Sequence, residues 1–387
     1  MSNTLRTWRR ACTPHRDIRE NAVSEALFAV NLSRAIADEG AEEYRDPTLF
    51  FERTHLTRTL KSLIRDVLNT LRVGSADAAS TSVIHLQTNF GGGKTHAELA
   101  LYHLLTRPDA ALAVPHVAAF LREHGLEQVP EAAIAALPCA DLDAGGREID
   151  GQGQAQPQQI NTLWGELAYR LGGEARGSKL YTIVADSDAR RGAPGVVKLR
   201  QLLTEAGPNI ILIDELLHYV DKAAAVTVGD SNLATQTLAF LRELTEAVDA
   251  VDHSILIASL TMSKLEDLQV FTEDEAEFTL TKLEDILRRV EDSRTPIEST
   301  EIYDIVRRAR SCPVAPRIVS ILSSTSNTPI TSCWPTTPAV RKSPKASPST
   351  WSRRSSPSRV RGEVRSVDRA PWPRERAPRH WASAPFR

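Results

Sequence analysis

One stretch, residues 82–104, constrains the fold of this chain more than any other. It reads SVIHLQTNFGGGKTHAELALYHL, which is a short apolar run, a glycine-rich turn, Lys94-Thr95 and a helix-like pattern. A loop that binds a nucleoside triphosphate needs this order of strand, turn, Lys-Thr and helix. Because Gly91 to Gly93 have no side chains, their backbone N–H groups can surround phosphate oxygens, and the helix start adds its positive dipole end. The stretch therefore predicts a phosphate-binding turn in an α/β fold.

The residue types suggest separate roles within this turn. Lys94 is expected to reach the β- and γ-phosphates of ATP, and the Thr95 hydroxyl to complete a Mg²⁺ shell. The usual Walker A pattern is G-x-x-x-x-G-K-[ST], and Thr88 stands where that pattern has glycine. The alternative is a glycine-rich turn that happens to precede a helix. The predicted nucleotide contacts are Thr88, Asn89, Phe90, Gly91, Gly92, Gly93, Lys94, Thr95 and His96.

A second informative stretch is NIILIDELLHYVD, residues 209–221. A fully apolar run that ends in two carboxylates is typical of a central strand in a parallel sheet, and ligands bind at the carboxyl ends of such strands. The stretch is therefore a Walker B candidate, in which Asp214 holds Mg²⁺ directly or through water and Glu215 polarises the attacking water. A buried strand followed by a helix with an acidic first turn is the alternative.

Further polar residues follow the next apolar run, SILIASL, at residues 254–260. In ATPases of the AAA+ type, a polar residue at the end of this strand senses the γ-phosphate, and Ser259 or Thr261 is placed to do so. Arg288, Arg289 and Arg294 are candidate γ-phosphate contacts from a neighbouring subunit of a homo-oligomer, although a solvated face is the simpler interpretation of each one.

Apolar spacing organises the rest of the chain. It predicts helices over 17–38 and 48–71, the second started by Asp46-Pro47. These helices would form an N-terminal segment (1–75) that packs on the core, followed by the ATPase domain (76–310) with a parallel sheet flanked by helices. Further expected elements are a helix over 115–126, a strand over 132–139, helices over 161–171 and 196–206, a helix capped by Asp230 or Ser231, and a helix-rich segment over 263–291. Residues 141–158 are expected to be an exposed loop, whose acidic pair Asp141 and Asp143 is better explained by solvation than by cation binding.

Composition limits the cellular setting. The four cysteines, Cys12, Cys139, Cys312 and Cys333, fit neither a disulfide framework nor a zinc-ligand spacing. The first residues, MSNTLRTWRRAC, lack the apolar core of a signal peptide, and no run approaches the ~18 apolar residues of a membrane span. We expect a cytoplasmic protein without a membrane partner.

Taken together, residues 12–308 resemble the amino-terminal ATPase part of a family of large bacterial and archaeal P-loop proteins. That family is described as AAA+-like and labelled a domain of unknown function. The segments that carry the resemblance are CTPHRDI, ALFAVNL, DPTLFFERTHLTRTLKSLI, HLQTNFGGGKTHAELALYHL, TLWGELAYRLGG and ILIDELLHYV. The family's loop is T-x-F-G-G-G-K-T, so Thr88 looks like a family feature, and the acidic pair carries over to Asp214 and Glu215. Members accompany DNA methyltransferases and helicases in phage-defence gene clusters. The resemblance therefore implies an ATP-hydrolysing component of such a system, with those enzymes as partners.

Composition changes abruptly at residue 311. Residues 311–387 carry 14 Lys and Arg against 3 Asp and Glu, whereas residues 1–310 carry 33 against 46. The last 77 residues also hold 12 of the 22 prolines and a single leucine, so they cannot bury enough apolar surface to fold and are expected to be disordered. They are either a basic Ser/Pro/Arg tail that binds nucleic acid or an acidic partner, or the out-of-frame translation of a truncated family member. The abruptness of the change favours the second. Family members are much longer than this chain, and a missing helical lid or arginine donor would impair hydrolysis.

Three functions follow from these patterns. The first is an ATP-hydrolysing motor or switch centred on Lys94, Thr95, Asp214 and Glu215. The second is a nucleotide-gated scaffold with little turnover, and the third is a nucleic-acid-binding protein that acts through its tail. The acidic balance of residues 1–310 argues against broad nonspecific DNA binding by the core itself. A small-molecule kinase is a further possibility that no acceptor-site pattern supports.

Overall fold

The computed structural model describes residues 30–73, 82–87, 93–149, 158–260, 270–287, 291–297 and 301. All of them belong to the first of two compact units, which are residues 1–324 and 325–387. The second unit, and with it most of the basic tail, lies outside the described residues.

A parallel sheet of five strands forms the centre of the described region, in the order β2-β5-β8-β1-β9. The strands are β1 (Val83–Leu86), β2 (Ala133–Pro138), β5 (Asn209–Asp214), β8 (Ser254–Ser259) and β9 (Glu291–Arg294). Every residue of β1, β5 and β8 is buried, which confirms the interpretation of the apolar runs as central strands. The predicted α/β class with a helix-flanked parallel sheet is also confirmed.

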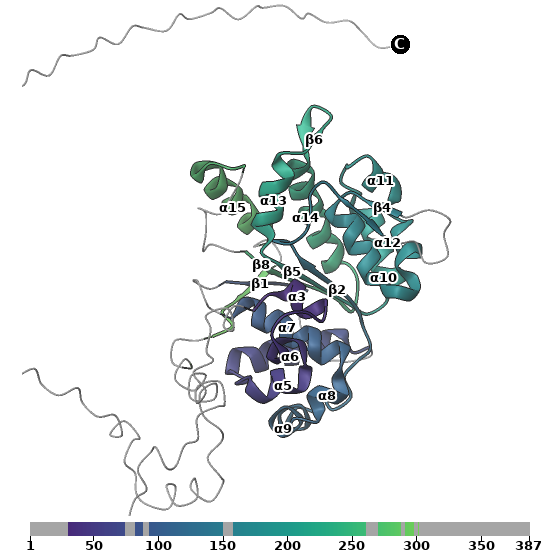
Figure 1. Cartoon of the computed structure of the whole chain (residues 1–387). Helices are drawn as coiled ribbons and strands as arrows, with labels where there is room; N and C mark the ends of the chain where they lie inside the picture. Colours follow the sequence, from purple (N-terminus) through teal and green to yellow (C-terminus); the bar gives the residue numbers. More distant parts are fainter. Residues whose placement is uncertain are drawn as a thin grey trace, which may run out of the picture. The chain divides into compact units, whose positions relative to one another are not determined.

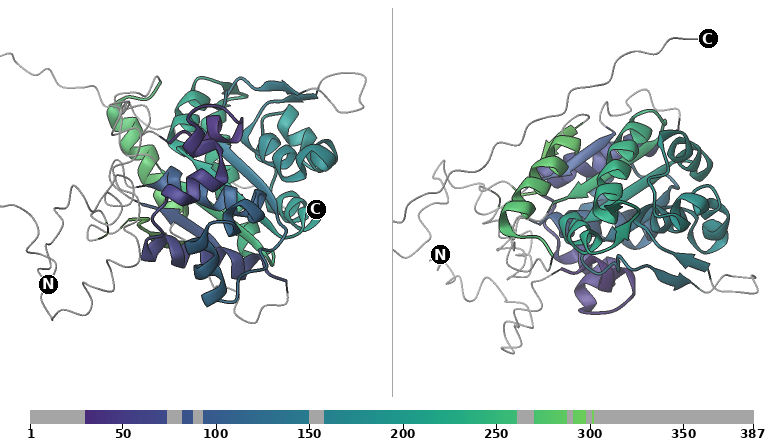
Figure 2. Two further views of the ribbon diagram at one scale, coloured as in Figure 1. Left: turned by 60° about the horizontal axis from the view of Figure 1, so that its bottom comes forward. Right: turned by 90° about the horizontal axis from the view of Figure 1, so that it is seen from above.

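Helices cover both faces of this sheet (Figures 1 and 2). One layer holds α10 (Leu163–Tyr181), α12 (Val196–Ala206), α13 (Leu216–Ala224) and α14 (Leu233–Asp249). The other holds α3 (Leu32–Ile36), α5 (Pro47–Arg53), α6 (Arg58–Leu71), α7 (Lys94–Thr106), α8 (Pro108–Leu112) and α9 (Pro115–Glu123). Strand β5 shows how one strand serves both layers, because Ile211 and Ile213 pack in the first core and Ile210 and Leu212 in the second.

The remaining elements are short or lie beside these layers. They are α4 (Glu42–Arg45), α11 (Ala185–Ala189), α15 (Glu273–Leu287) and two hairpins, β3 (Arg147–Ile149) with β4 (Gln158–Ile160) and β6 (Thr227–Val228) with β7 (Ser231–Asn232). None of the described helices has the length and apolar character needed to span a bilayer.

Several element boundaries differ from the sequence prediction. The single helix expected over 48–71 is two helices, because the Thr57 hydroxyl accepts a hydrogen bond from the Leu60 N–H at 3.1 Å and starts α6 anew. The predicted start at Asp46-Pro47 is confirmed, since Asp46 accepts from the Leu49 N–H at 2.9 Å. The cap of α14 is Asn232 rather than Asp230 or Ser231. The expected loop over 141–158 contains β3 and the start of β4, and residues 17–29 of the first expected helix lie outside the described residues.

Candidate functional site

Three chain segments meet where the central strands end. Strand β5 ends at Asp214, β8 ends at Ser259, and α7 begins at Lys94 after β1. Since β8 lies between β1 and β5 and all three run parallel, their carboxyl ends share one edge of the sheet. The two halves of the site that the sequence predicted are therefore brought together, although they are 120 residues apart.

Asp214 and Ser259 form the best-defined contact of this edge. The Ser259 Oγ donates a hydrogen bond to Asp214 Oδ1 at 2.6 Å and accepts one from the Glu215 N–H at 3.1 Å. Asp214 is 5% exposed and Ser259 is fully buried. Burial raises the pKa of Asp214, whereas hydrogen bonds from Ser259 and Thr95 and the charge of Lys94 lower it. The serine thus fixes both the carboxylate and the backbone that follows it.

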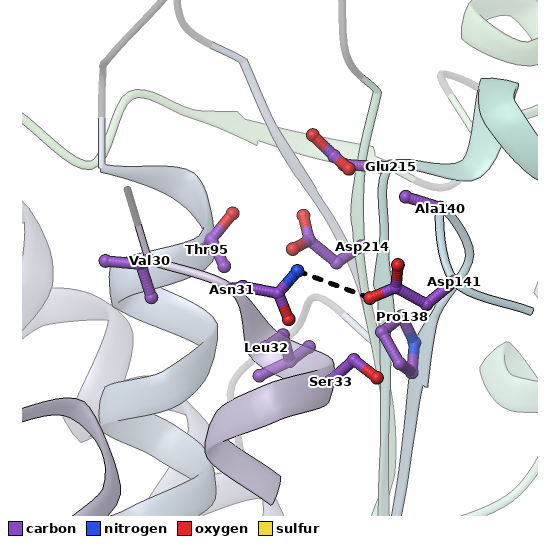
Figure 3. A pocket seen from close by; sticks show the side chains of 10 residues that line it. All are labelled: Val30, Asn31, Leu32, Ser33, Thr95, Pro138, Ala140, Asp141, Asp214 and Glu215. Atoms are coloured by element: carbon purple, nitrogen blue, oxygen red, sulfur yellow. Dashed lines mark hydrogen bonds between the residues drawn. The ribbon is translucent and has the colours of Figure 1, made fainter. Parts of the chain in front are cut away.

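Glu215 has an unusual backbone for its residue type. Its φ of 55° and ψ of 45° lie in the left-handed region, which costs a residue with a Cβ about 1 kcal/mol or more. The conformation ends β5 and starts α13 within a single residue. Figure 3 shows the two carboxylates next to each other at the same strand end.

Lys94 lies among carboxylates at the first position of α7. Burial lowers the pKa of its ammonium group, and the charges of Asp214, Glu98 and Glu215 raise it. The preceding Gly93 has a φ of 75°, and a Cβ at this position would lie 2.8 Å from the Ile297 Cδ1. The left-handed backbone favours glycine immediately before the lysine, whereas the contact could be relieved by a shift of the Ile297 side-chain end. Residues 88–92, which hold the predicted Thr88, Asn89, Phe90, Gly91 and Gly92, lie outside the described residues.

Glu98 is an acidic residue of this site that the sequence interpretation missed. It stands one helical turn after Lys94 and is fully buried. Burial, followed by the charges of Asp214 and Glu215, raises its pKa well above the ordinary value. The Ser259 hydroxyl lowers that pKa, but its single hydrogen goes to Asp214. A protonated Glu98 is therefore the form that suits these surroundings. The sequence signal that could have revealed Glu98 is a charged residue inside the apolar pattern AELAL.

The His96 side chain packs away from Asp214, on helix α5. Its Nε2 lies 3.0 Å from the Thr54 Oγ1, and its ring lies 4.5 Å from that of Phe50. Because the Thr54 hydroxyl donates to the Phe50 carbonyl oxygen at 2.7 Å, the imidazole is the donor to Thr54. Burial, followed by the charge of His103, lowers the pKa of His96 to about 4. Any contact of His96 with a nucleotide would therefore come from its backbone.

This pKa shift predicts a loss of stability in acid. Below about pH 6.5 the unfolded chain takes up a proton at His96, whereas the folded chain stays neutral there until about pH 4. The free energy of unfolding should fall by about 3 kcal/mol over this range through His96 alone. We expect His96→Gln, which keeps a donor for Thr54, to remove this component in urea titrations at pH 7 and pH 4.5. His124→Gln at an exposed position is the matched control, and equal pH dependence in the two variants would contradict the assignment.

Of the arginine and threonine residues that the sequence proposed as γ-phosphate contacts, the structure describes Arg294. The Arg294 guanidinium forms an ion pair with Asp66 of α6 at 2.7 Å, and the nearby Pro296 carbonyl oxygen accepts hydrogen bonds from Thr57 and Thr59. Arg294 therefore ties the end of β9 to the helical layer. Thr261, Arg288 and Arg289 lie outside the described residues.

A small cavity opens beside the Asp214 carboxylate (Figure 3). Its volume is about 40 Å³, which is room for about three water molecules and too little for a nucleoside. Thr95, Asp214 and Glu215 line one part of it. The other part comes from two places that the sequence did not connect with the site. They are residues 30–33, and the last residue of β2 (Pro138) with the following turn, which holds Ala140 and Asp141.

Comparison with known proteins identifies a family. The model of the DUF499 N-terminal domain matches residues 13–295. This chain belongs to the DUF499 family. No curated protein and no solved structure matches it. DUF499 is an uncharacterised family, so the match carries no activity to this chain, and it spans both Lys94 and Asp214.

Proposed function

We propose that this DUF499 chain binds ATP with Mg²⁺ at the shared strand edge and hydrolyses it, as an ATPase of the AAA+-like P-loop type. The observation that carries the proposal is the meeting of Lys94, Thr95, Asp214 and Ser259 at one place. Lys94 begins a helix after a buried strand and a glycine in the left-handed conformation, and Asp214 ends the strand two positions away in the sheet. A glycine-rich turn without a binding role would not be expected to lie beside a buried carboxylate such as Asp214, which Ser259 and Thr95 contact through their hydroxyls.

The side chains present fit a Mg²⁺ ion that arrives with a nucleotide. Among the described residues, no group of three or more His, Cys, Asp or Glu side chains is arranged to hold a metal ion on its own. In nucleotide sites Mg²⁺ takes one or two protein oxygens and completes its shell with phosphates and water. The Thr95 hydroxyl and the Asp214 carboxylate, which interact with each other, are oxygen donors of this kind.

Each residue then has a distinct task. Lys94 would place its positive charge against the β- and γ-phosphates, and the bound Mg²⁺ would neutralise charge that develops on them. The Glu215 carboxylate would orient the attacking water and accept its proton. Ser259 would keep Asp214 and the Glu215 backbone in position, since it already contacts both.

A wider role follows from the family resemblance alone. We infer a component of a phage-defence system that works with a DNA methyltransferase or helicase and assembles with copies of itself. The nucleotide-gated scaffold stays the alternative, because a site that binds ATP without turnover would use the same Lys94 and Asp214.

The proposed site is tested first by titration calorimetry of the full chain with ATP. We expect saturable binding that is stronger with Mg²⁺ than with EDTA. Absence of ATP binding in both conditions would overturn the proposal.

A further inference from the structure

A pair of polar side chains, Asn31 and Asp141, lines the cavity together with Asp214. We propose that these two residues are positioning residues that hold the water shell of the Mg²⁺ ion delivered with ATP. The inference rests on the proposed function. It names Asn31, which the sequence did not single out, and Asp141, for which the sequence favoured solvation over cation binding. Figure 3 shows the Asn31 amide reaching toward Asp141 beneath Asp214 and Thr95.

Two hydrogen bonds orient the exposed Asn31 side chain at the start of α3. Its Oδ1 accepts a hydrogen bond from the Arg34 N–H at 2.8 Å and so caps the helix. Its Nδ2 donates to Asp141 Oδ2 at 3.3 Å. The amide therefore links the start of α3 to the turn after β2, and it donates a hydrogen bond to one oxygen of the Asp141 carboxylate.

The turn that carries Asp141 is fixed from two further directions. The Lys222 ammonium of α13 donates to the carbonyl oxygens of Ala140 and, at 3.1 Å, Leu142. The Cys139 N–H donates to the Asp214 carbonyl oxygen at 2.9 Å. Asp141 thus stands between two anchored carbonyls although its own side chain is exposed. These bonds hold the backbone of the turn, and the Asn31 amide contacts the carboxylate of Asp141 at the cavity that both residues line.

The chemistry of the cavity selects a hydrated cation. Carboxylates from three different positions, Asp141, Asp214 and Glu215, border a space that holds about three waters. Mg²⁺ loses its water reluctantly and usually keeps several water molecules when it binds with a nucleotide. Such waters donate hydrogen bonds outward, so a carboxylate on the far wall is their natural acceptor. Partners of this outer kind usually change metal affinity or activity by about 10- to 100-fold when they are removed.

A purely structural role makes a different prediction from this one. If Asn31 and Asp141 only tied residues 30–33 to the sheet, their loss would weaken ATP binding equally with and without Mg²⁺. If Asp141 holds the Mg²⁺ waters, Asp141→Asn should weaken binding only when Mg²⁺ is present. Without Mg²⁺ the variant should bind ATP as well as the wild type or better, since one negative charge near the phosphates is gone.

The experiment measures the ATP dissociation constant of the full chain in saturating Mg²⁺ and in EDTA. We expect Asp141→Asn to raise the constant about tenfold in Mg²⁺ and not in EDTA. Asn31→Ser, which keeps the helix cap and removes the amide, should shift it in the same direction by a smaller factor. Asp143→Asn is the matched control, because this residue has the same charge in the same turn, does not line the cavity, and accepts its hydrogen bond from the Gly145 N–H.

The outcomes separate the inference from the proposed function. Equal effects of Asp141→Asn and Asp143→Asn in Mg²⁺, with normal binding by the wild type, would overturn the role of Asp141 and leave the ATP site standing. Equal weakening of Asp141→Asn in Mg²⁺ and EDTA, with a lower melting temperature, would also overturn it in favour of the structural role. Failure of the wild type to bind ATP in either condition would overturn both.

Discussion

Replacement of Lys94 by alanine is expected to abolish measurable ATP binding, with a rise of the dissociation constant of at least about 100-fold. The ammonium group is the positive charge that faces Asp214, Glu98 and Glu215 at the start of α7. Without it, ATP would bring its phosphates to the carboxylates of Asp214 and Glu215 without the positive charge that the chain itself supplies. A loss of roughly 3 kcal/mol corresponds to two hydrogen bonds to charged groups, which makes the 100-fold figure a lower limit.

Two further variants make this result interpretable. Lys94→Met keeps the aliphatic stem and should fail to bind ATP as Lys94→Ala does, which separates the charge from the packing. Lys198→Ala removes a lysine whose partner is the largely exposed Asp186, and it should bind ATP normally. Unchanged ATP affinity in both Lys94 variants would refute the nucleotide site at α7.

Replacement of Glu215 by glutamine is expected to leave ATP binding intact and to reduce hydrolysis by about 10²- to 10⁴-fold. Gln has the shape of Glu but cannot accept the proton of an attacking water at neutral pH. The backbone N–H bond from this position to Ser259 is kept, and Gln has nearly the size of Glu, so folding should be unaffected. The measurement is phosphate release per mole of chain, together with calorimetric ATP binding.

The same variant separates the motor from the scaffold. A motor loses turnover and cellular activity together when Glu215 is changed, whereas a scaffold keeps its cellular activity. Glu246→Gln, on the exposed face of α14, is the matched control for the loss of one carboxylate. Hydrolysis by Glu215→Gln at the wild-type rate would show that another residue activates the water.

The sequence predicted the strands that position the site, because runs such as Ile210 to Ile213 are apolar throughout and end in polar residues. It also predicted that Asp214 follows one of these strands and that Ser259 or Thr261 lies at the end of another, as a contact of the γ-phosphate. It did not predict the order of the strands, which depends on packing between distant segments. It is this order that sets Ser259 directly beside Asp214.

Other features left too weak a signal in the sequence. The break between α5 and α6 was missed because the leucine spacing continues across it. The hydrogen bond from the Leu60 N–H to the Thr57 hydroxyl nevertheless starts a new helix there. The hairpin of β3 and β4 was missed because its strands are three residues long and mostly polar. Asn31 and Asp141 look like ordinary helix-cap and loop residues. Only the tertiary structure brings them to the same cavity.

The most direct test of the central claim is a diffraction structure of the chain with a non-hydrolysable ATP analogue and Mn²⁺ in place of Mg²⁺. The anomalous signal of Mn²⁺ locates the metal independently of the rest of the map. We predict the metal beside the Thr95 hydroxyl, with the γ-phosphate against Lys94 and the Asp214 carboxylate in contact with the metal directly or through a metal-bound water. A nucleotide bound elsewhere on the chain, with no metal signal near Thr95 and Asp214, would contradict the account.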